Sequence, residues 1–485
     1  MKRMNRILAT ALAIALWAFI PGGAALAENE LVTDIDLASG LEAPGVKVES
    51  IVENHPDVAE EYAQTANTVY TITENGIYRF TGELENGQIR VDAPQADDIR
   101  IILAGVTLTN RTAPALYIKN AFETGDTGLA AVRIHLQEGT LNVLNGSHYA
   151  KHTDSEGNEI DHDGAVSSAV SLVFEGEGAL EINADNEGIE GQMHLIINGG
   201  DISILSGDDA INGSADNESH IVINAGRIAA KSILGKEGDG IDSNGSITVN
   251  GGTVIAIANP DSMDSGLDSD LGITINGGIM AASGNMYDEI SSSSPQRFIH
   301  LVFTAPGVAD TPVVLTDEGG RALIAFAPPV AYTQMTLSIP GMTDGLYQVY
   351  KGGSLDSEAK DGLYPLGSAY APGVLQENGG STQETGRPGG MKQQDGQRPE
   401  GSPPEGMPGG TPPEGMPQGE PPALPENMTE GQVPQPPQGM EGQPPMFGRG
   451  TAPSPSPGGV ISTDFPLSAQ SYYFIGVGDA QASPK

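Results

Sequence analysis

A repeat with a fixed period runs through the middle of this sequence and limits the folds it can adopt. Four short segments carry one pattern, in which alternating apolar residues lead into an asparagine and a glycine-containing corner: 195–200, 221–226, 247–252 and 273–278. Their asparagines are Asn198, Asn224, Asn250 and Asn276, so each step is 26 residues long. A period of this length is typical of proteins built by stacking one structural unit on the next.

The pattern within each unit predicts short β-strands. Ile221 and Ile223 alternate with other residues at period two, and the alternation resumes after the corner, as at Val254 and Ala256. Glycine supplies the positive φ that tight corners need. One turn of strands for each repeat predicts an all-β fold of the parallel β-helix type, a solenoid whose rungs stack about 4.8 Å apart. The asparagines would then form a ladder of amide groups at one corner.

A second, acidic motif precedes three of the asparagines by a constant interval. Gly188-Ile-Glu190, Gly240-Ile-Asp242 and Gly266-Leu-Asp268 occupy equivalent places in their repeats. In the remaining repeat, Ala210-Ile-Asn212 lies further from its asparagine, which indicates a four-residue insertion. Stacking of the rungs would align these side chains in a column.

Carboxylates in such a column suggest a metal site. Two carboxylates about 5 Å apart repel each other by about 3 kcal/mol at an effective dielectric constant of 20. The column therefore either stays hydrated or binds a divalent cation, and Ca²⁺ prefers these oxygen ligands. The alternative is a solvated polar turn rich in Asp and Gly. The candidate metal ligands are Asp185, Asn186, Glu187, Glu190, Asp208, Asp209, Asn212, Asp239, Asp242, Asp264, Asp268 and Asp270.

The first 27 residues have the features of a secretory signal peptide. Basic residues precede an apolar run over 7–20, and Ala25-Leu-Ala27 provides a cleavage site. No other apolar stretch is long enough to span a membrane. The sequence contains no cysteine, which excludes disulfides and a lipid anchor on cysteine. We expect a secreted, extracellular protein, in keeping with association with a cell wall.

The remaining chain divides by composition. We expect a cap segment over 28–66, a β-helix domain over 67–376 that ends in closing strands, a disordered Pro/Gly-rich segment over 377–459, and a returning terminal strand within 460–485. The cap is expected because an uncovered end rung would expose unpaired strand edges. The Pro/Gly-rich segment has too few apolar residues to form a core.

The charge of the chain narrows the range of partners. Loss of the signal peptide removes three of the 23 basic residues, which leaves 20 against 63 acidic residues and a net charge of −43. Such a charge argues against nucleic acid and anionic membranes as partners. It suits calcium, although solubility alone also explains an acidic surface.

Several stretches resemble a family of secreted bacterial carbohydrate-binding proteins. The resemblance covers about residues 67–376 and rests on the repeat units and on 76–82, 87–92, 103–108, 138–142 and 313–352. It implies a right-handed parallel β-helix of the pectate-lyase type that contains calcium. It also implies polysaccharide binding without catalysis, with acidic sugars such as polygalacturonate, and cellulose, among the ligands.

Enzymatic alternatives remain open at the level of sequence. Gly207-Asp-Asp209 is similar to a polygalacturonase motif, but the chain has no Gly-His-Gly and no Arg-Ile-Lys to complete it. A calcium-dependent polysaccharide lyase would need a basic group beside the metal, and Arg227, Lys231 and Lys236 are the candidates. A structural or adhesive protein without a sugar ligand is the third alternative. Zinc is disfavoured, because eight scattered histidines provide no ligand set.

Overall fold

The computed structural model describes residues 31–378, apart from 154–156, 158, 292 and 344, together with 465–467 and 471–479. The predicted signal peptide and nearly all of the Pro/Gly-rich segment lie outside these residues. The described part is all-β, and its one helical element is the short 3₁₀ helix η1 (Leu37–Ser39). No helix in it is both long and apolar enough to cross a membrane. The prediction of an all-β fold is therefore confirmed.

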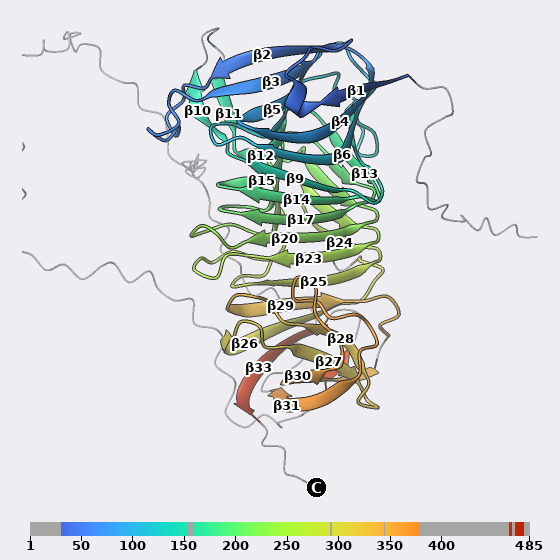
Figure 1. The fold of residues 1–485 in the computed structure, drawn as a ribbon. Helices are drawn as coiled ribbons and strands as arrows, with labels where there is room; N and C mark the ends of the chain where they lie inside the picture. Colours follow the sequence, from blue (N-terminus) through green and yellow to red (C-terminus); the bar gives the residue numbers. More distant parts are fainter. Residues whose placement is uncertain are drawn as a thin grey trace, which may run out of the picture. The chain divides into compact units, whose positions relative to one another are not determined.

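The first of three strand ladders forms a separate sheet, and from β3 onward its strands run parallel. In Figure 1, β2, β3, β5, β12 and β15 of this ladder follow one another in chain order from the top downward. The strands of the first ladder are β2 (Val46–Val52), β3 (Ala66–Ile72), β5 (Gly87–Asp92), β7 (Leu116–Asn120), β12 (Gly164–Ser168), β15 (Glu187–Gly191), β18 (Ile211–Gly213) and β21 (Ile241–Ser243).

The second ladder contains the segments that lead into the repeated asparagines. Its parallel register places Leu195, Ile221, Ile247 and Ile273 on successive strands, as the 26-residue period requires. The strands of the second ladder are β4 (Gly76–Glu85), β6 (Ile99–Thr109), β8 (Val132–Leu136), β13 (Leu172–Gly176), β16 (Leu195–Ile197), β19 (His220–Ile223), β22 (Ser246–Val249) and β24 (Gly272–Ile275).

The third ladder follows the glycine corners. At one such corner Gly226 has a φ of 89°, and a Cβ atom there would lie 2.7 Å from the carbonyl oxygen of Gly200 on the preceding turn. Only glycine fits this close approach. The strands of the third ladder are β9 (Leu141–Gly146), β14 (Ala179–Ala184), β17 (Asp201–Ser206), β20 (Arg227–Ser232), β23 (Thr253–Ile257) and β25 (Ile279–Gly284).

A continuous apolar core fills the space between the ladders. Ile204, Ile211 and Ile223 come from three different ladders and are all fully buried in this core. Burial of a side chain of this size contributes about 1.5–3 kcal/mol. The repeated alternation of apolar residues therefore provides the main stabilisation of the stack.

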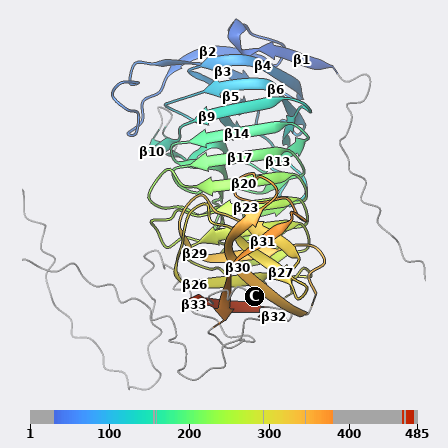
Figure 2. The same cartoon turned by 60° about the horizontal axis from the view of Figure 1, so that its bottom comes forward.

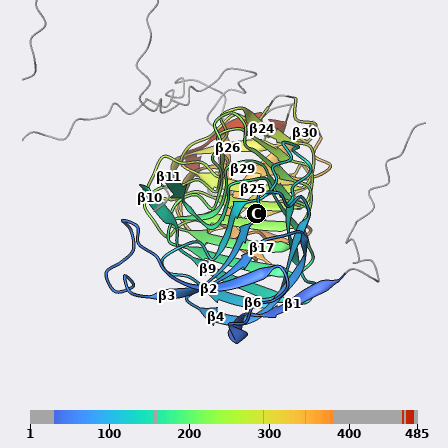
Figure 3. The ribbon, with the colours of Figure 1, turned by 90° about the horizontal axis from the view of Figure 1, so that it is seen from above.

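The N-terminal end of the stack carries additional strands. β1 (Val32–Asp36) pairs in parallel with β4, and β2 pairs antiparallel with β3. After the early turns, β10 (Tyr149–Thr153) and β11 (Glu159–His162) form an antiparallel hairpin. Figure 3, viewed from the β2 end, shows this hairpin at the side of the stack.

The closing strands follow β25. β29 pairs antiparallel with both β25 and β26, and β33 pairs in parallel with β26 (Figure 2). Their apolar residues form a second core against outward-facing side chains of the third ladder, among them Ala229 and Ile255. The closing strands are β26 (Ile299–Gly307), β27 (Val313–Asp317), β28 (Ala322–Phe326), β29 (Tyr332–Ser338), β30 (Gly345–Leu355), β31 (Tyr370–Asn378), β32 (Phe465–Leu467) and β33 (Ser471–Asp479).

Candidate functional site

The acidic motifs of the sequence lie in register along the first ladder. Glu190 pairs with Asn212, and Asn212 pairs with Asp242. Asp268 continues this column, because the preceding Leu267 bridges to Ile241. A second column lies two residues before the paired isoleucines and contains Glu187, Asp209 and Asp239 in the same order. Register alone thus brings two rows of carboxylates to one edge of the molecule.

Three of these carboxylates form a compact cluster. Asp239, Asp242 and Asp268 each offer one oxygen, and the three oxygens lie within 4.8 Å of one another. All three residues are partly buried, so water screens their charges incompletely. At such distances each pair of charges repels by about 3 kcal/mol at an effective dielectric constant of 20. We refer to these residues as the three-aspartate cluster.

The environment of the cluster favours protonated carboxyl groups when no cation is bound. Burial, followed by the charge of Asp268, raises the pKa of Asp242 to about 7. Burial and the neighbouring charge of Asp209 raise the pKa of Asp239 well above its usual range. Burial and the charge of Asp242 raise the pKa of Asp209 well above its usual range. A divalent cation would replace these protons and remove the repulsion.

Further along the columns, two buried oxygen atoms have no hydrogen-bond partner among the described residues. Asn212 Nδ2 donates to Glu187 Oε1 at 2.7 Å, which leaves Glu187 Oε2 and Asn212 Oδ1 without donors. Burial and the charge of Asp209 raise the pKa of Glu187 well above normal. Bare acceptor oxygens of this kind are ligands that Ca²⁺ prefers, so the residues present fit a calcium ion.

Glu190 accepts several hydrogen bonds from protein donors. Ser167 Oγ donates to Glu190 Oε2 at 2.7 Å, and the backbone N–H of Asp163 donates to the same oxygen at 3.1 Å. His162 Nδ1 lies 3.7 Å from this oxygen. Burial, followed by the charge of Glu190, raises the pKa of Asp163 to about 6. Asp163 and His162 belong to the hairpin region, which the repeat does not predict.

The remaining predicted ligands lie at the margins of the columns or away from them. Asp185 is exposed and accepts a hydrogen bond from Ser147 Oγ at 2.6 Å. Asn186 uses its backbone carbonyl to accept from the N–H groups of residues 207 and 208. Asp264 accepts from the backbone N–H of Gly238 at 2.6 Å.

Two further predicted ligands contribute no oxygen to the three-aspartate cluster. Asp208 is half-buried, and its burial, followed by the charge of Glu237, raises its pKa. Asp270 is exposed.

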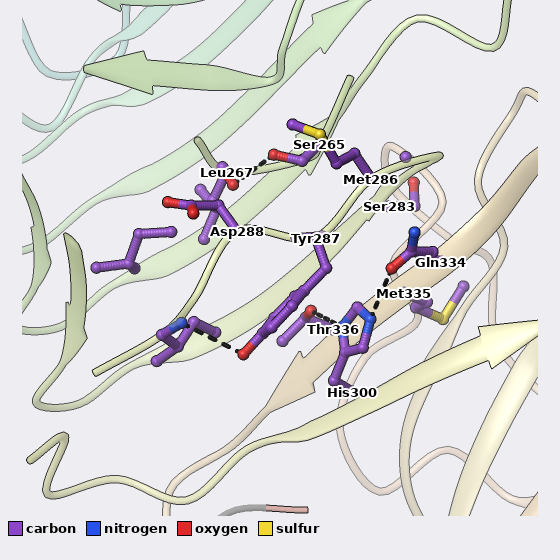
Figure 4. Close-up of a pocket in the computed structure, with 15 residues that line it drawn as sticks. Ser265, Leu267, Ser283, Met286, Tyr287, Asp288, His300, Gln334, Met335 and Thr336 are labelled. Atoms are coloured by element: carbon purple, nitrogen blue, oxygen red, sulfur yellow. Dashed lines mark hydrogen bonds between the residues drawn. The ribbon is translucent and has the colours of Figure 1, made fainter. Parts of the chain in front are cut away.

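A small cavity lies at the last turn of the stack (Figure 4), and Leu267, which precedes Asp268 in the chain, lines it. Asp288 and Tyr287 line it, and His300 is held there by Gln334 Oε1 at 3.0 Å and by Thr336 Oγ1 at 2.7 Å. The cavity measures about 20 Å³, which is room for about one water molecule. It is too small for a sugar ring. Asp288 also accepts from the backbone N–H of Ser269, so it adds an acid near Asp268 that the repeat does not predict.

The repeated asparagines form a continuous chain of side-chain hydrogen bonds. Asn224 Nδ2 donates to Asn198 Oδ1 at 2.8 Å, Asn250 to Asn224 at 2.7 Å and Asn276 to Asn250 at 2.7 Å. The row stabilises the corner between the second and third ladders. The asparagine side chains use their donors and acceptors in bonds to one another, so their role is structural. The row lies apart from the acidic columns, which follow the first ladder.

Comparison with known proteins finds a matching family model, a related protein and a solved structure. A family model described as "Carbohydrate-binding domain-containing protein" matches residues 66–324, more than half of the 485 residues. A protein of the same description from Acetivibrio thermocellus is 32% identical over 134 residues, which are 27% of this chain and 43% of the relative's length. A solved structure of a polysaccharide lyase-like protein from C. thermocellum, a gadolinium derivative, is 21% identical to this chain, with a TM-score of 0.35. The match covers 54% of this chain and 95% of that protein.

Proposed function

Because this chain belongs to the family of carbohydrate-binding domain-containing proteins, we propose that it is a secreted protein that binds an acidic polysaccharide through calcium. Polygalacturonate is the model ligand, and cellulose is a second ligand to test. The predicted signal peptide over 1–27 supports secretion, and the acidic composition supports a cation as the intermediary.

We further infer that the three ladders form a right-handed parallel β-helix. From β12 to β23, each strand of one ladder connects to the next strand of the same ladder through strands of the other two, and the paired strands run parallel. Crossovers between parallel strands of one sheet are almost always right-handed, because of the twist of the strands.

The three-aspartate cluster is the observation that carries the calcium proposal. Three carboxylate oxygens that converge within 4.8 Å supply part of the shell of six to eight oxygens that Ca²⁺ takes. The uronate carboxylate of a sugar would complete the shell. Without such a cation, a chain of this negative charge repels a polyuronate.

A polysaccharide lyase is the second candidate function, and one observation favours it. Lys236 is exposed on the loop that leads from β20 to Asp239, so a base could approach a calcium-bound sugar from there. The other two candidate bases differ. Arg227 and Lys231 both pair with the carboxylate of Asp361, at 2.7 and 2.6 Å, which disfavours a role as a free base.

Binding of polygalacturonate with calcium and with chelator tests the proposal. We expect binding in calcium, loss of affinity in chelator, and weaker calcium-dependent binding for Asp242→Asn and Asp268→Asn. Glu181→Gln, an exposed acid on β14 outside the columns, is the matched control and should bind as the wild type does. Equal binding by a chelated, folded protein would overturn the mechanism. Release of unsaturated sugars, seen by ultraviolet absorbance, would instead identify a lyase, and Lys236→Gln should then abolish it.

A further inference from the structure

A loop between β30 and β31 places a carboxylate between two cations of the stack. In this loop (356–369), Asp361 Oδ2 lies 2.7 Å from Arg227 Nη1, and Lys231 Nζ donates to Asp361 Oδ1 at 2.6 Å. The side chains of Arg227, Lys231 and Asp361 are only 20%, 15% and 13% exposed. One carboxylate thus holds two largely buried cations, each through a separate oxygen.

The two cations point outward from β20. The intervening residues Ile228 and Ala230 belong to the core of the stack, so strand alternation directs Arg227 and Lys231 to the outer face. Lys360 is a third cation on this face, and Arg227 Nη2 donates to its carbonyl oxygen at 2.9 Å. A second carboxylate, Asp201, pairs with Lys360 and also lies 3.6 Å from Arg227 Nη1. In a chain with 63 acidic and 23 basic residues, this concentration of cations on one face stands out.

The backbone conformation of the loop directs the side chain of Asp361 toward β20. Asp361 has a φ of 49° and Gly362 a φ of 81°, both in the left-handed region. Gly362 accepts from Ala327 N–H at 2.8 Å, and Tyr364 N–H donates to Ala325 at 3.1 Å, so the neighbouring residues are anchored to the closing strands. Asp is among the non-glycine residues that adopt this conformation in turns, so the two anchors hold Asp361 in a fixed position against β20.

We propose that Arg227 and Lys231 form a binding subsite for a carboxylate of an acidic polysaccharide, and that Asp361 occupies this subsite as an intramolecular competitor. The contact is autoinhibitory, because the chain's own carboxylate takes the place of the ligand's. The class of ligand rests on the proposed function, but the site is separate from the acidic columns and needs no calcium.

The chemistry of the pair matches this ligand. A guanidinium group binds a carboxylate with good geometry and strong, charge-assisted hydrogen bonds, and an ammonium group adds a flexible donor. Burial alone would raise the pKa of Asp361, yet the hydrogen bond from Lys231 and the charge of Arg227 hold the pKa of this carboxyl below its usual range. The pair therefore stabilises a bound carboxylate anion, and a uronate presents the same group.

The test compares Asp361→Asn with Asp317→Asn, using a fluorescently labelled oligogalacturonate at fixed calcium and ionic strength. Both variants lose one negative charge in the closing strands and their connections, but Asp317 pairs with an exposed arginine, Arg321, away from β20. We expect Asp361→Asn to bind about tenfold more tightly than Asp317→Asn, because two charge-assisted contacts become available. Addition of Lys231→Gln to Asp361→Asn should remove most of the gain.

Each outcome decides the proposal. A folded Asp361→Asn protein that binds no better than Asp317→Asn would show that Asp361 only fastens the closing strands, and the proposal would be wrong. If Asp361→Asn does not fold, Asp361→Ser, which keeps a hydrogen-bond acceptor, takes its place with the same expectation. Failure of the calcium mechanism is distinguishable, because it removes the effect of Asp242→Asn and leaves the gain in Asp361→Asn intact.

Discussion

At the scale of single residues, His148 connects three separate segments of the chain. Its Nδ1 lies 3.2 Å from Asp185 Oδ1, and its Nε2 lies 3.1 Å from Asp57 Oδ2. The hydrogen bond with Asp185 has the largest effect on the pKa of His148 and raises it. Burial lowers this pKa, the hydrogen bond with Asp57 raises it further, and the resulting pKa is about 9. The protonated imidazole thus ties the loop after β2 to the side of the stack.

The raised pKa of His148 predicts a pH-dependent contribution to stability. The folded pKa exceeds the unfolded value of about 6.5, so the contribution is complete below pH about 6.5 and is lost as the pH rises through 9. His148→Gln should cost about 2 kcal/mol at pH 6, as for hydrogen bonds to a charged group. Urea unfolding at pH 6 and pH 10 measures the difference between wild type and variant. A difference that does not shrink at pH 10 would contradict this account.

The pKa of Asp242 predicts that calcium binding is linked to protons. The folded pKa of about 7 exceeds the unfolded value of about 3.9, so the metal-free protein loses stability as the pH rises from about 4 to above 7. Calcium needs the carboxylate form, so its affinity should increase from pH 5.5 to pH 8 and binding should release protons. Calorimetry in two buffers of different ionisation enthalpy counts the protons, and Asp242→Asn should release fewer. Affinity that is independent of pH would contradict the prediction.

At the scale of elements, the period of the sequence predicts much of the strand register. A spacing of 26 residues places Ile247 between Ile221 and Ile273, and the structure pairs them in this order. The second core is not predicted by the period, although apolar residues at outward positions indicate that something covers the third ladder. Ile255 and Ile257 of β23 are apolar at outward positions, which is typical of strands covered on both faces. The period alone does not show which segment covers them.

The asparagine row predicts unequal effects of equivalent substitutions. Asn224 takes part in two hydrogen bonds of the row, whereas Asn276 takes part in one. At about 1 kcal/mol for each bond, Asn224→Ala should cost about 2 kcal/mol and Asn276→Ala about 1 kcal/mol. Denaturant unfolding of the two variants measures these costs. Equal costs would show that the row does not act as a chain of separate bonds.

At the scale of the whole molecule, parts of the candidate site fall outside the repeat. The period predicts the columns that contain Glu190, Asp242 and Asp268, because equivalent residues stack. It does not predict Asp163, which follows the inserted hairpin, or Asp288, which follows the last full turn. The contact between Lys231 and Asp361 joins residues 130 positions apart, and no local pattern indicates such docking.

Calcium should stabilise the whole fold if it binds the acidic columns. An ion that binds only the folded state adds about 2.7 kcal/mol for each site at a hundredfold excess over Kd. We expect the Tm to fall by several degrees in chelator and to recover when calcium is added back. Differential scanning calorimetry with matched magnesium samples tests this, since Mg²⁺ demands a smaller, octahedral shell. An identical Tm in calcium and chelator would contradict the calcium sites.

The constant register also governs how such a protein can change its length during evolution. Ile221 and Ile273 both pair with Ile247 at equivalent positions, so excision of one whole repeat would bring β19 directly onto β24 without a shift in alignment. Duplication of a repeat would likewise insert a turn that fits both neighbours. The edge that carries the acidic columns therefore lengthens or shortens in steps of about 4.8 Å. If this edge binds a glycan as proposed, tandem duplication can match it to longer or shorter chains more readily than point substitution.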